Sequence, residues 1–163
     1  MKIEKVATGV LAVCLLACGG SPDTAGGPAS GTGGGEGTAL TAEQLERGIG
    51  PVREVELGAL DEALAARGKA VFDLKCSACH KVSERYVGPA LGDVLERRRP
   101  EYVMNMILNP AEMVEKHPSA RELLGQFMTP MPDQNLTEDE ARAVLEYLRT
   151  VQTEVNGTGS GGQ

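Results

Sequence analysis

The sequence predicts an all-α fold, and three observations lead to that prediction. Strand signals are absent, whereas apolar residues recur at helical spacing between residues 59 and 152. Helix-start signals recur as well: Thr41, Ser119 and Thr137 each open a Ser/Thr-x-x-Glu/Gln capping pattern. The chain has 163 residues, which is room for one domain, and part of it is not expected to fold. The sequence therefore predicts one small helical domain with flanking segments.

Four helices are predicted in this domain. The first covers residues 61–75, and the second begins after Pro100, a favoured first-turn residue, and stops at Asn109. The third is short, from Ser119 through Leu124, and the last runs from Thr137 to about Val151. The residues expected to face the core are Leu64, Val71, Phe72 and Leu74 in the first helix, Val103, Met106 and Ile107 in the second, and Ala141, Val144, Leu145 and Leu148 in the last.

Residues 1–18 form a predicted lipoprotein signal segment. Lys2 and Lys5 give it a positive start, and the following apolar run is too short to span a membrane. The run ends in Leu15-Leu16-Ala17-Cys18, which resembles the bacterial lipobox, so Cys18 is expected to carry lipid and become the new N-terminus. An ordinary signal peptide is the alternative. We expect an exported protein anchored to the periplasmic side of a membrane, with the inner and the outer membrane both open.

The segments beside the domain differ in composition. Residues 19–39 are rich in Gly and small polar residues and predict a flexible tether. Residues 40–58 contain the Thr41 capping pattern, followed by a break at Gly48-Ile49-Gly50-Pro51, and are read as an N-terminal arm packed on the domain, a plain linker being the alternative. The domain follows at residues 59–152, and a disordered tail is expected at 153–163.

The charge balance is acidic. The chain has 16 basic and 23 acidic side chains, a net charge of −7, and loss of residues 1–17 would leave −8. An acidic surface argues against nucleic acid as a partner. It fits a protein that docks weakly and briefly on a complementary basic patch of a protein partner.

The strongest chemical signal is Cys76-Ser77-Ala78-Cys79-His80. In a Cys-x-x-Cys-His motif the two thiols attach covalently to the vinyl groups of haem, and the adjacent histidine binds the iron. Cys76 and Cys79 are therefore expected to form thioethers with one haem c, with His80 as the proximal ligand. The domain has under a hundred residues and no Trp, so a haem between its helices would also supply a large apolar core element.

Other interpretations of this motif are weaker. A zinc site needs more ligands, but the domain holds no second cysteine pair and only one further histidine, His117. A thioredoxin-type dithiol requires a βαβ context that the sequence does not predict. A chance occurrence of the motif is the remaining alternative.

An electron carrier usually has six-coordinate iron, so a second axial ligand is expected. The downstream candidates are Met104, Met106, Met113, His117, Met128 and Met131. Met131 lies in a loop before the last helix, and a loop can lay a thioether over a flat ring more easily than a helix can. We expect Met131 to be the distal ligand and take Met128 as the runner-up. Met104 and Met106 are expected to pack in the core, and His117 to be exposed.

These residues resemble the class I cytochromes c over nearly all of residues 59–151. Gly68-Lys69-Ala70-Val71-Phe72 and Val144-Leu145-Glu146-Tyr147 are similar to the motifs of the family's first and last helices, which cross at the glycine. Gly88-Pro89-Ala90-Leu91 resembles the loop whose proline carbonyl accepts a hydrogen bond from the proximal histidine. The resemblance implies that role for Pro89 and orientation of His80 by it. Met131-Pro132 resembles the distal-ligand loop.

Two segments depart from the family pattern. Residues 109–127 are not part of it and could close the haem edge or dock a partner. Glu96-Arg97-Arg98-Arg99 is a basic cluster in an acidic chain; it could pair with haem propionates or a partner's carboxylates, or be a solvated charge run.

The expected function is single-electron transfer rather than catalysis, with no small-molecule substrate. The resemblance implies a quinol-oxidising complex as donor and a terminal oxidase or an anaerobic reductase as acceptor, and it permits nitrous-oxide reductase. One alternative is a haem peroxidase or gas sensor with a labile distal ligand. Another is a haem subunit of a larger oxidoreductase, held by residues 40–58.

Overall fold

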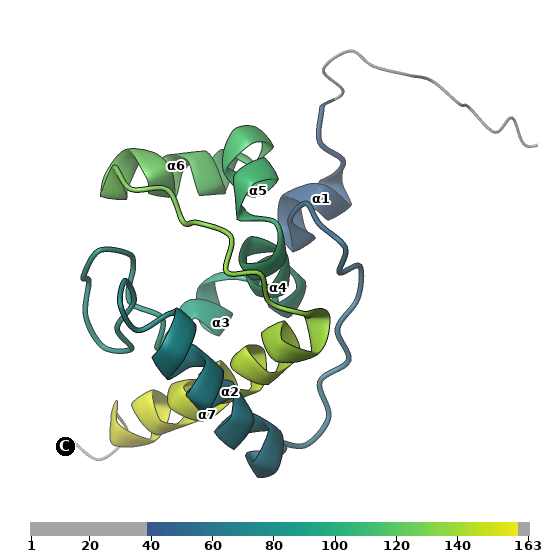
Figure 1. Cartoon of the computed structure of the whole chain (residues 1–163). Helices are drawn as coiled ribbons and strands as arrows, with labels where there is room; N and C mark the ends of the chain where they lie inside the picture. The colour runs from purple at the N-terminus through teal and green to yellow at the C-terminus, as the bar shows by residue number, and fades with distance from the viewer. Residues whose placement is uncertain (1–38, 160–163) are drawn as a thin grey trace, which may run out of the picture. The chain divides into compact units, whose positions relative to one another are not determined.

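The computed structural model describes residues 39–159, with side chains described through residue 152. The predicted signal segment, Cys18 and all but the end of the tether lie outside these residues. The described part contains seven helices and no strand (Figure 1): α1 (Ala42–Arg47), α2 (Glu62–Lys75), α3 (Val94–Arg97), α4 (Pro100–Leu108), α5 (Pro110–Lys116), α6 (Pro118–Phe127) and α7 (Glu138–Gly159). The predicted all-α fold is therefore confirmed. Within residues 39–159, no helix is long and apolar enough to cross a membrane.

Helices α2 and α7 pack directly against each other at the base of the domain (Figure 1). At their contact, a β-carbon on Gly68 would overlap the backbone carbonyl of Ala143, so the glycine lets the two backbones meet. Beside it, the rings of Phe72 and Tyr147 lie 5.2 Å apart in a tilted arrangement. The helix crossing that the resemblance implied is thus present, and it fixes the direction in which α2 delivers the Cys76 to His80 segment.

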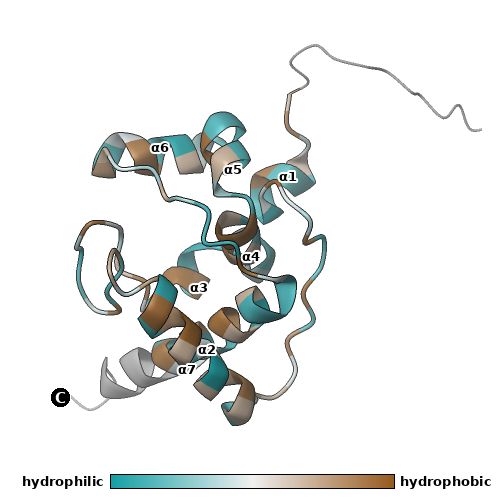
Figure 2. Ribbon diagram, viewed as in Figure 1, coloured by the Kyte–Doolittle hydropathy of each residue, from teal (hydrophilic) through white to brown (hydrophobic). Residues whose placement is uncertain are grey.

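The main core lies between α2, α4 and α7, where hydrophobic residues gather in the middle of the domain (Figure 2). Its buried members are Val52, Phe72, Val103, Met104, Ile107, Ala141, Val144, Leu145 and Leu148. Leu74 was expected to face inward, and that expectation is wrong, because its side chain is 78% exposed. Leu74 lies outside the face of α2 that contacts α7.

The capping patterns define two helix starts as expected. At α1, Gln44 N–H donates to Thr41 Oγ1 and Gln44 Oε1 accepts from Thr41 N–H, at 3.1 and 3.0 Å. At α7, Glu140 N–H donates to Thr137 Oγ1 at 3.2 Å, and the Glu140 carboxylate accepts from Thr137 N–H at 2.8 Å. Helix α7 then continues to Gly159, well beyond the predicted end at Val151 and into the segment expected to be disordered.

The capping pattern at Ser119 predicted the start of its helix two residues too late. Helix α6 begins at Pro118 with His117 as its N-cap, and His117 Nδ1 accepts a hydrogen bond from Ser119 N–H at 3.2 Å. Ser119 is therefore inside the helix. Helix α4 ends at Asn109 as predicted, and Asn109 is at the same time the N-cap position of α5, a helix that was not predicted.

The arm, residues 40–58, is held by buried side chains of the helical domain. Ile49 and Val52 are buried. The carboxamide of Asn105 donates to the carbonyls of Arg47 and Val52 and accepts from Val52 N–H, all at 2.9 Å. His117 Nε2 lies 3.1 Å from the Leu45 carbonyl oxygen. The arm thus packs along α4 and the start of α6.

Candidate haem-binding site

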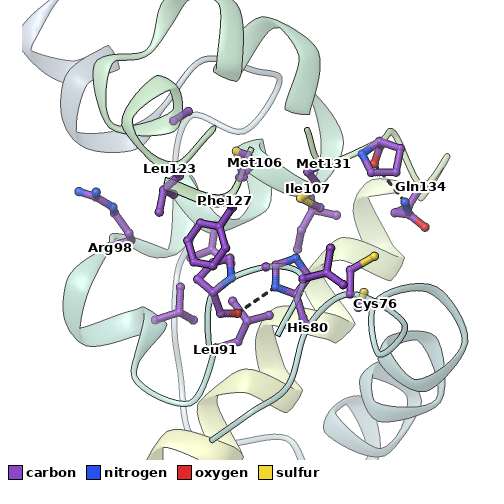
Figure 3. Close-up of a pocket in the computed structure, with 18 of the residues that line it drawn as sticks. Cys76, His80, Leu91, Arg98, Met106, Ile107, Leu123, Phe127, Met131 and Gln134 are labelled. Atoms are coloured by element: carbon purple, nitrogen blue, oxygen red, sulfur yellow. Dashed lines mark hydrogen bonds between the residues drawn. The ribbon is translucent and has the colours of Figure 1, made fainter. Parts of the chain in front are cut away.

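A large, mainly apolar cleft opens between two parts of the domain. One wall comes from α2 and residues 76–91, and the other from α4, α6 and residues 129–134. Figure 3 shows side chains from both walls pointing toward the same space, with His80 and Met131 reaching it from separate segments. The cleft brings together the residues that the sequence singled out at positions 76, 79, 80, 89 and 131.

The attachment motif forms a tight turn at the end of α2. Cys76 is the C-cap of that helix, and its carbonyl accepts hydrogen bonds from Cys79 N–H and His80 N–H at 3.1 and 2.9 Å. Both cysteines are free thiols, half-buried, and line the cleft. Burial raises the pKa of the Cys76 thiol to about 11, as expected for a thiol on an apolar wall. The turn therefore presents two thiols and one imidazole to the same cavity.

A hydrogen bond to the backbone of Pro89 orients the imidazole of His80. Its Nδ1 lies 3.0 Å from the carbonyl oxygen of Pro89, the dashed contact in Figure 3. A carbonyl can only accept, so Nδ1 carries the hydrogen and Nε2 keeps its lone pair for a metal. Gly88 makes the approach possible, because a β-carbon there would lie 2.5 Å from His80 Cε1. A side chain at position 88 would push the ring out of place.

The methionines differ in their burial and in whether they line the cleft. Met131 is half-buried, packs against the core and lines the cleft. Met128 follows α6 in a left-handed conformation (φ 54°), is 81% exposed and is not among the cleft residues. Met106 of α4 packs against a second core cluster, as the sequence predicted, and it also lines the cleft. Met104 is buried in the core as expected, and Met113 is fully buried with its sulfur 3.0 Å from Ile49 N.

His117 is not exposed, contrary to the sequence-based expectation. Only 1% of its surface is accessible, and both ring nitrogens have partners. The ring also meets Tyr102 edge-on, with the centroids 5.1 Å apart. Burial lowers the pKa of His117, which favours the neutral ring. The proline at 118 and the lysine at 116 suggested a surface position, but the ring turns inward as a helix cap.

The segment that departed from the family pattern forms one wall of the cleft. Helix α6 places Ala120, Leu123, Leu124 and Phe127 there. The same four positions follow the i, i+3, i+4, i+7 spacing of an amphipathic helix, which is the signal that could have located this wall from sequence. Residues 109–127 therefore cover the cleft on the side opposite the attachment turn.

The arginine cluster is engaged within the protein. Arg97 forms an ion pair with Asp93 at 2.8 Å and donates to the Ala90 carbonyl at 2.9 Å. Arg98 lies over the ring of Tyr102, 5.0 Å from its centroid. Both arginines line the cleft. The position suits contact with the carboxylates of a bound group.

The residues at the cleft fit a covalently attached haem. Two thiols at the required spacing, one imidazole with a fixed tautomer, an apolar lining and two arginines at the border match the thioethers, iron, macrocycle and propionates of haem c. Among residues 39–159 there is no cluster of three or more His, Cys, Asp or Glu side chains that could hold a metal ion by itself.

Comparison with known proteins gives the family. The sequence model of cytochrome c matches residues 65–152, more than half of the chain. The chain belongs to the cytochrome c family. This family consists of electron-transfer proteins, and its domain implies covalent haem c.

Several individual proteins are similar to this cytochrome. Cytochrome c-551 of Stutzerimonas stutzeri is 31% identical over 97 residues, covering 58% of this chain and 86% of that protein. A cytochrome c-553-like protein of Synechocystis is 28% identical over 88 residues, covering 53% and 69%. Among solved structures, the cytochrome c from Rhodothermus marinus is 48% identical with a TM-score of 0.66, covering 69% of this chain and 97% of that one.

Proposed function

We propose that this cytochrome carries one electron at a time on a haem c that is bound covalently by Cys76 and Cys79 and ligated by His80 and Met131. The observation that carries the proposal is the hydrogen bond from His80 Nδ1 to the Pro89 carbonyl, because it leaves Nε2 as a metal ligand on the cleft side. The bond also restricts rotation of the ring.

The second ligand is inferred from position. Of the two methionines that the sequence favoured, only Met131 lines the cleft, whereas Met128 is exposed. Met106 lines the cleft too, but it belongs to helix α4, while Met131 belongs to a segment without helical structure. A loop would bring its thioether to a bound iron more easily than a helix would. We therefore assign Met131 as the distal ligand.

When bound, haem iron supplies a centre that gains and loses one electron, and the residues here keep its surroundings constant. Pro89 fixes the ring of His80, and the apolar walls from α4 and α6 exclude water from the cleft. A thioether ligand and an apolar setting both favour the reduced state and raise the potential. Partners would dock weakly and briefly, as redox proteins do.

The sequence outside the described residues favours a particular cellular location for this carrier. The lipobox-like run before Cys18 and the Gly-rich residues 19–39 favour a lipid-anchored domain on a tether at the periplasmic side of a membrane. There it would take electrons from a quinol-oxidising complex and pass them to a terminal oxidase or an anaerobic reductase, nitrous-oxide reductase among them. Cys18→Ser should release the protein to the soluble fraction, and retention in the membrane would contradict the anchor.

Haem staining of a denaturing gel tests the attachment. The wild-type band should stain for haem and show a reversible reduced-minus-oxidised spectrum of c type. Cys76→Ala and Cys79→Ala together should abolish the stain, whereas Ser77→Ala, in the same turn, should keep it. A stained band in the double variant, or a wild-type protein that cannot be reduced and reoxidised, would exclude the proposed function.

A further inference from the structure

We propose that the surface formed by Lys81, Arg85, Tyr86, Val87 and Met128, here called the edge surface, docks an acidic redox protein. The proposal rests on the electron-carrier function and adds the charge of the partner. Val87 of this surface lines the cleft, and the next residue, Gly88, donates its N–H to the Cys79 carbonyl of the attachment turn at 2.8 Å. Met128 directly follows Phe127 at the opposite wall of the cleft. An electron leaving the haem at this border would cross the edge surface.

Lys81 contributes a positive charge that is held by uncharged partners. Its ammonium group donates to the carbonyl of Ser77 at 3.0 Å and lies 5.0 Å from the ring centroid of Tyr86. None of the ion pairs within residues 39–152 involves Lys81. The charge therefore has a fixed place beside the attachment turn and no carboxylate that neutralises it.

Arg85 is held in the same manner on the other side. Its guanidinium donates to the Gln126 carbonyl at 2.8 Å and lies 4.1 Å from the centre of the Phe127 ring. Phe127 lines the cleft, so this cation stands at the cleft border, between the residue 80s segment and α6. No ion pair in the described part of the chain includes Arg85 either. Both cations are pre-positioned, which lowers the entropy lost when a partner's carboxylates bind.

The charge around the attachment turn has the opposite sign from the chain as a whole. Residues 75–92 hold three basic and one acidic side chain, a net charge of +2. The remaining residues hold thirteen basic and twenty-two acidic side chains, a net charge of −9. Glu84 is the only acidic residue between positions 75 and 92. Such a separation orients the molecule in the field of an acidic partner, with the haem side leading.

Exposed apolar side chains accompany the two cations on this surface. Tyr86 and Val87 are exposed on the segment after Lys81, and Met128 is the most exposed large hydrophobic residue described. Apolar side chains together with separate charges are typical of a protein interface. An anionic membrane is instead recognised by a dense cluster of basic residues, which positions 75–92 do not form. The edge surface therefore fits a protein better than a lipid headgroup layer.

Stopped-flow oxidation of the reduced holoprotein measures the charge at this surface. Ferricyanide is a trianion and tris(phenanthroline)cobalt(III) a trication, and both accept one electron without specific docking. If the edge surface is the exit, the ferricyanide rate constant should fall severalfold as ionic strength rises, and the cobalt rate constant should increase. A protein that reacted according to its net negative charge would give the reverse dependence, and that result would overturn the inference.

Charge-reversed variants locate the effect. Lys81→Glu and Arg85→Glu should each flatten the salt dependence with ferricyanide and with oxidised plastocyanin, an acidic copper protein. Arg53→Glu changes the net charge equally at an exposed position of the arm and should leave both slopes as in the wild type. The dependence of the rate constant on ionic strength is the readout, because it reports the charge at the reacting surface and not the driving force of the reaction. Equal slopes in all three variants would refute the edge surface as the docking site.

Two further outcomes separate the explanations. If the two edge variants lost binding to phosphatidylserine vesicles but reacted normally with plastocyanin, the surface would face lipid and the inference would be wrong. If neither inorganic oxidant reoxidised the wild-type protein, the electron-carrier function itself would fail. Lys81→Gln and Arg85→Gln, with intermediate slopes, would show that loss of charge and not of folding causes the change.

Discussion

Gly68 of α2 faces the backbone carbonyl of Ala143 in α7, with no space for a side chain between them. A β-carbon at Gly68 would overlap the Ala143 carbonyl group and stand 2.9 Å from Val144 N. These are backbone atoms of a packed helix, so no rotamer change can relieve the overlap. The contact fixes the crossing of the two helices and, through α2, the place of the attachment turn.

Gly68→Ala should therefore destabilise the domain by about 3 kcal/mol or more, because overpacking against a backbone forces the helices apart. Gly125→Ala is the matched control: Gly125 lies inside α6, and its added β-carbon would meet nothing within 4 Å. That variant should gain up to about 1 kcal/mol from helix propensity. Denaturant unfolding of both holoproteins measures the difference, and equal stabilities would contradict the close crossing.

Much of this arrangement could be predicted from sequence because it depends on local patterns. The Thr41 and Thr137 capping boxes and the Gly68 to Phe72 motif are short, and each meets its structural partner as expected. The inward face of α2 was predicted less well, and Leu74 is the error. The periodicity of apolar residues does not show how many positions of α2 are covered by the contact with α7.

Met131→Ala should remove the weak sulfur-to-iron absorption band from the ferric spectrum and lower the reduction potential, because the thioether favours the reduced state. Met128→Ala should leave both unchanged, since Met128 is exposed. Met106→Leu is the second control, because Met106 also lines the cleft and Leu preserves its bulk. Loss of the band in either control, with Met131→Ala retaining it, would reassign the ligand.

Asn105→Ala should cost about 2–4 kcal/mol of unfolding free energy, since it leaves three backbone groups of the buried arm unpaired. The affected groups are the Arg47 carbonyl and both polar groups of Val52. The variant should also be cleaved faster by protease between residues 47 and 53, while its haem spectrum remains normal. Gln126→Ala, at an exposed amide, should behave as the wild type. An unchanged cleavage rate in Asn105→Ala would show that the arm is held by other contacts.

The remaining features of the site depend on contacts between distant residues, and the sequence does not reveal them. Met106 packs against the core as expected, but the sequence does not reveal that it also lines the cleft, whose other wall comes from α6. His117 stands between Lys116 and Pro118, which favours exposure, but its ring is buried by the Leu45 carbonyl of the arm, 72 residues away. Only the fold brings those segments together.

The buried ring of His117 makes stability depend on pH. Burial is the largest cause that lowers its pKa below the ordinary value of about 6.5, outweighing the hydrogen bond to Leu45. As pH falls below about 6.5, the unfolded chain therefore binds a proton that the folded protein does not. The unfolding free energy should decrease in this range, with a slope approaching about 1.4 kcal/mol per pH unit, and level off below the folded pKa. The lowered pKa values of Glu101 and Glu146 act only below about 4.5.

His117→Gln removes the titrating group and keeps an amide N–H that can donate to the Leu45 carbonyl. In this variant the unfolding free energy should be nearly flat between pH 6.5 and about 5, in contrast to the wild type. The folded-state pKa can be measured independently from the ring resonances of the reduced, diamagnetic protein, and it should lie below 6.5. A folded pKa above 6.5, or the same slope in His117→Gln and the wild type, would show that His117 is not buried as a neutral ring.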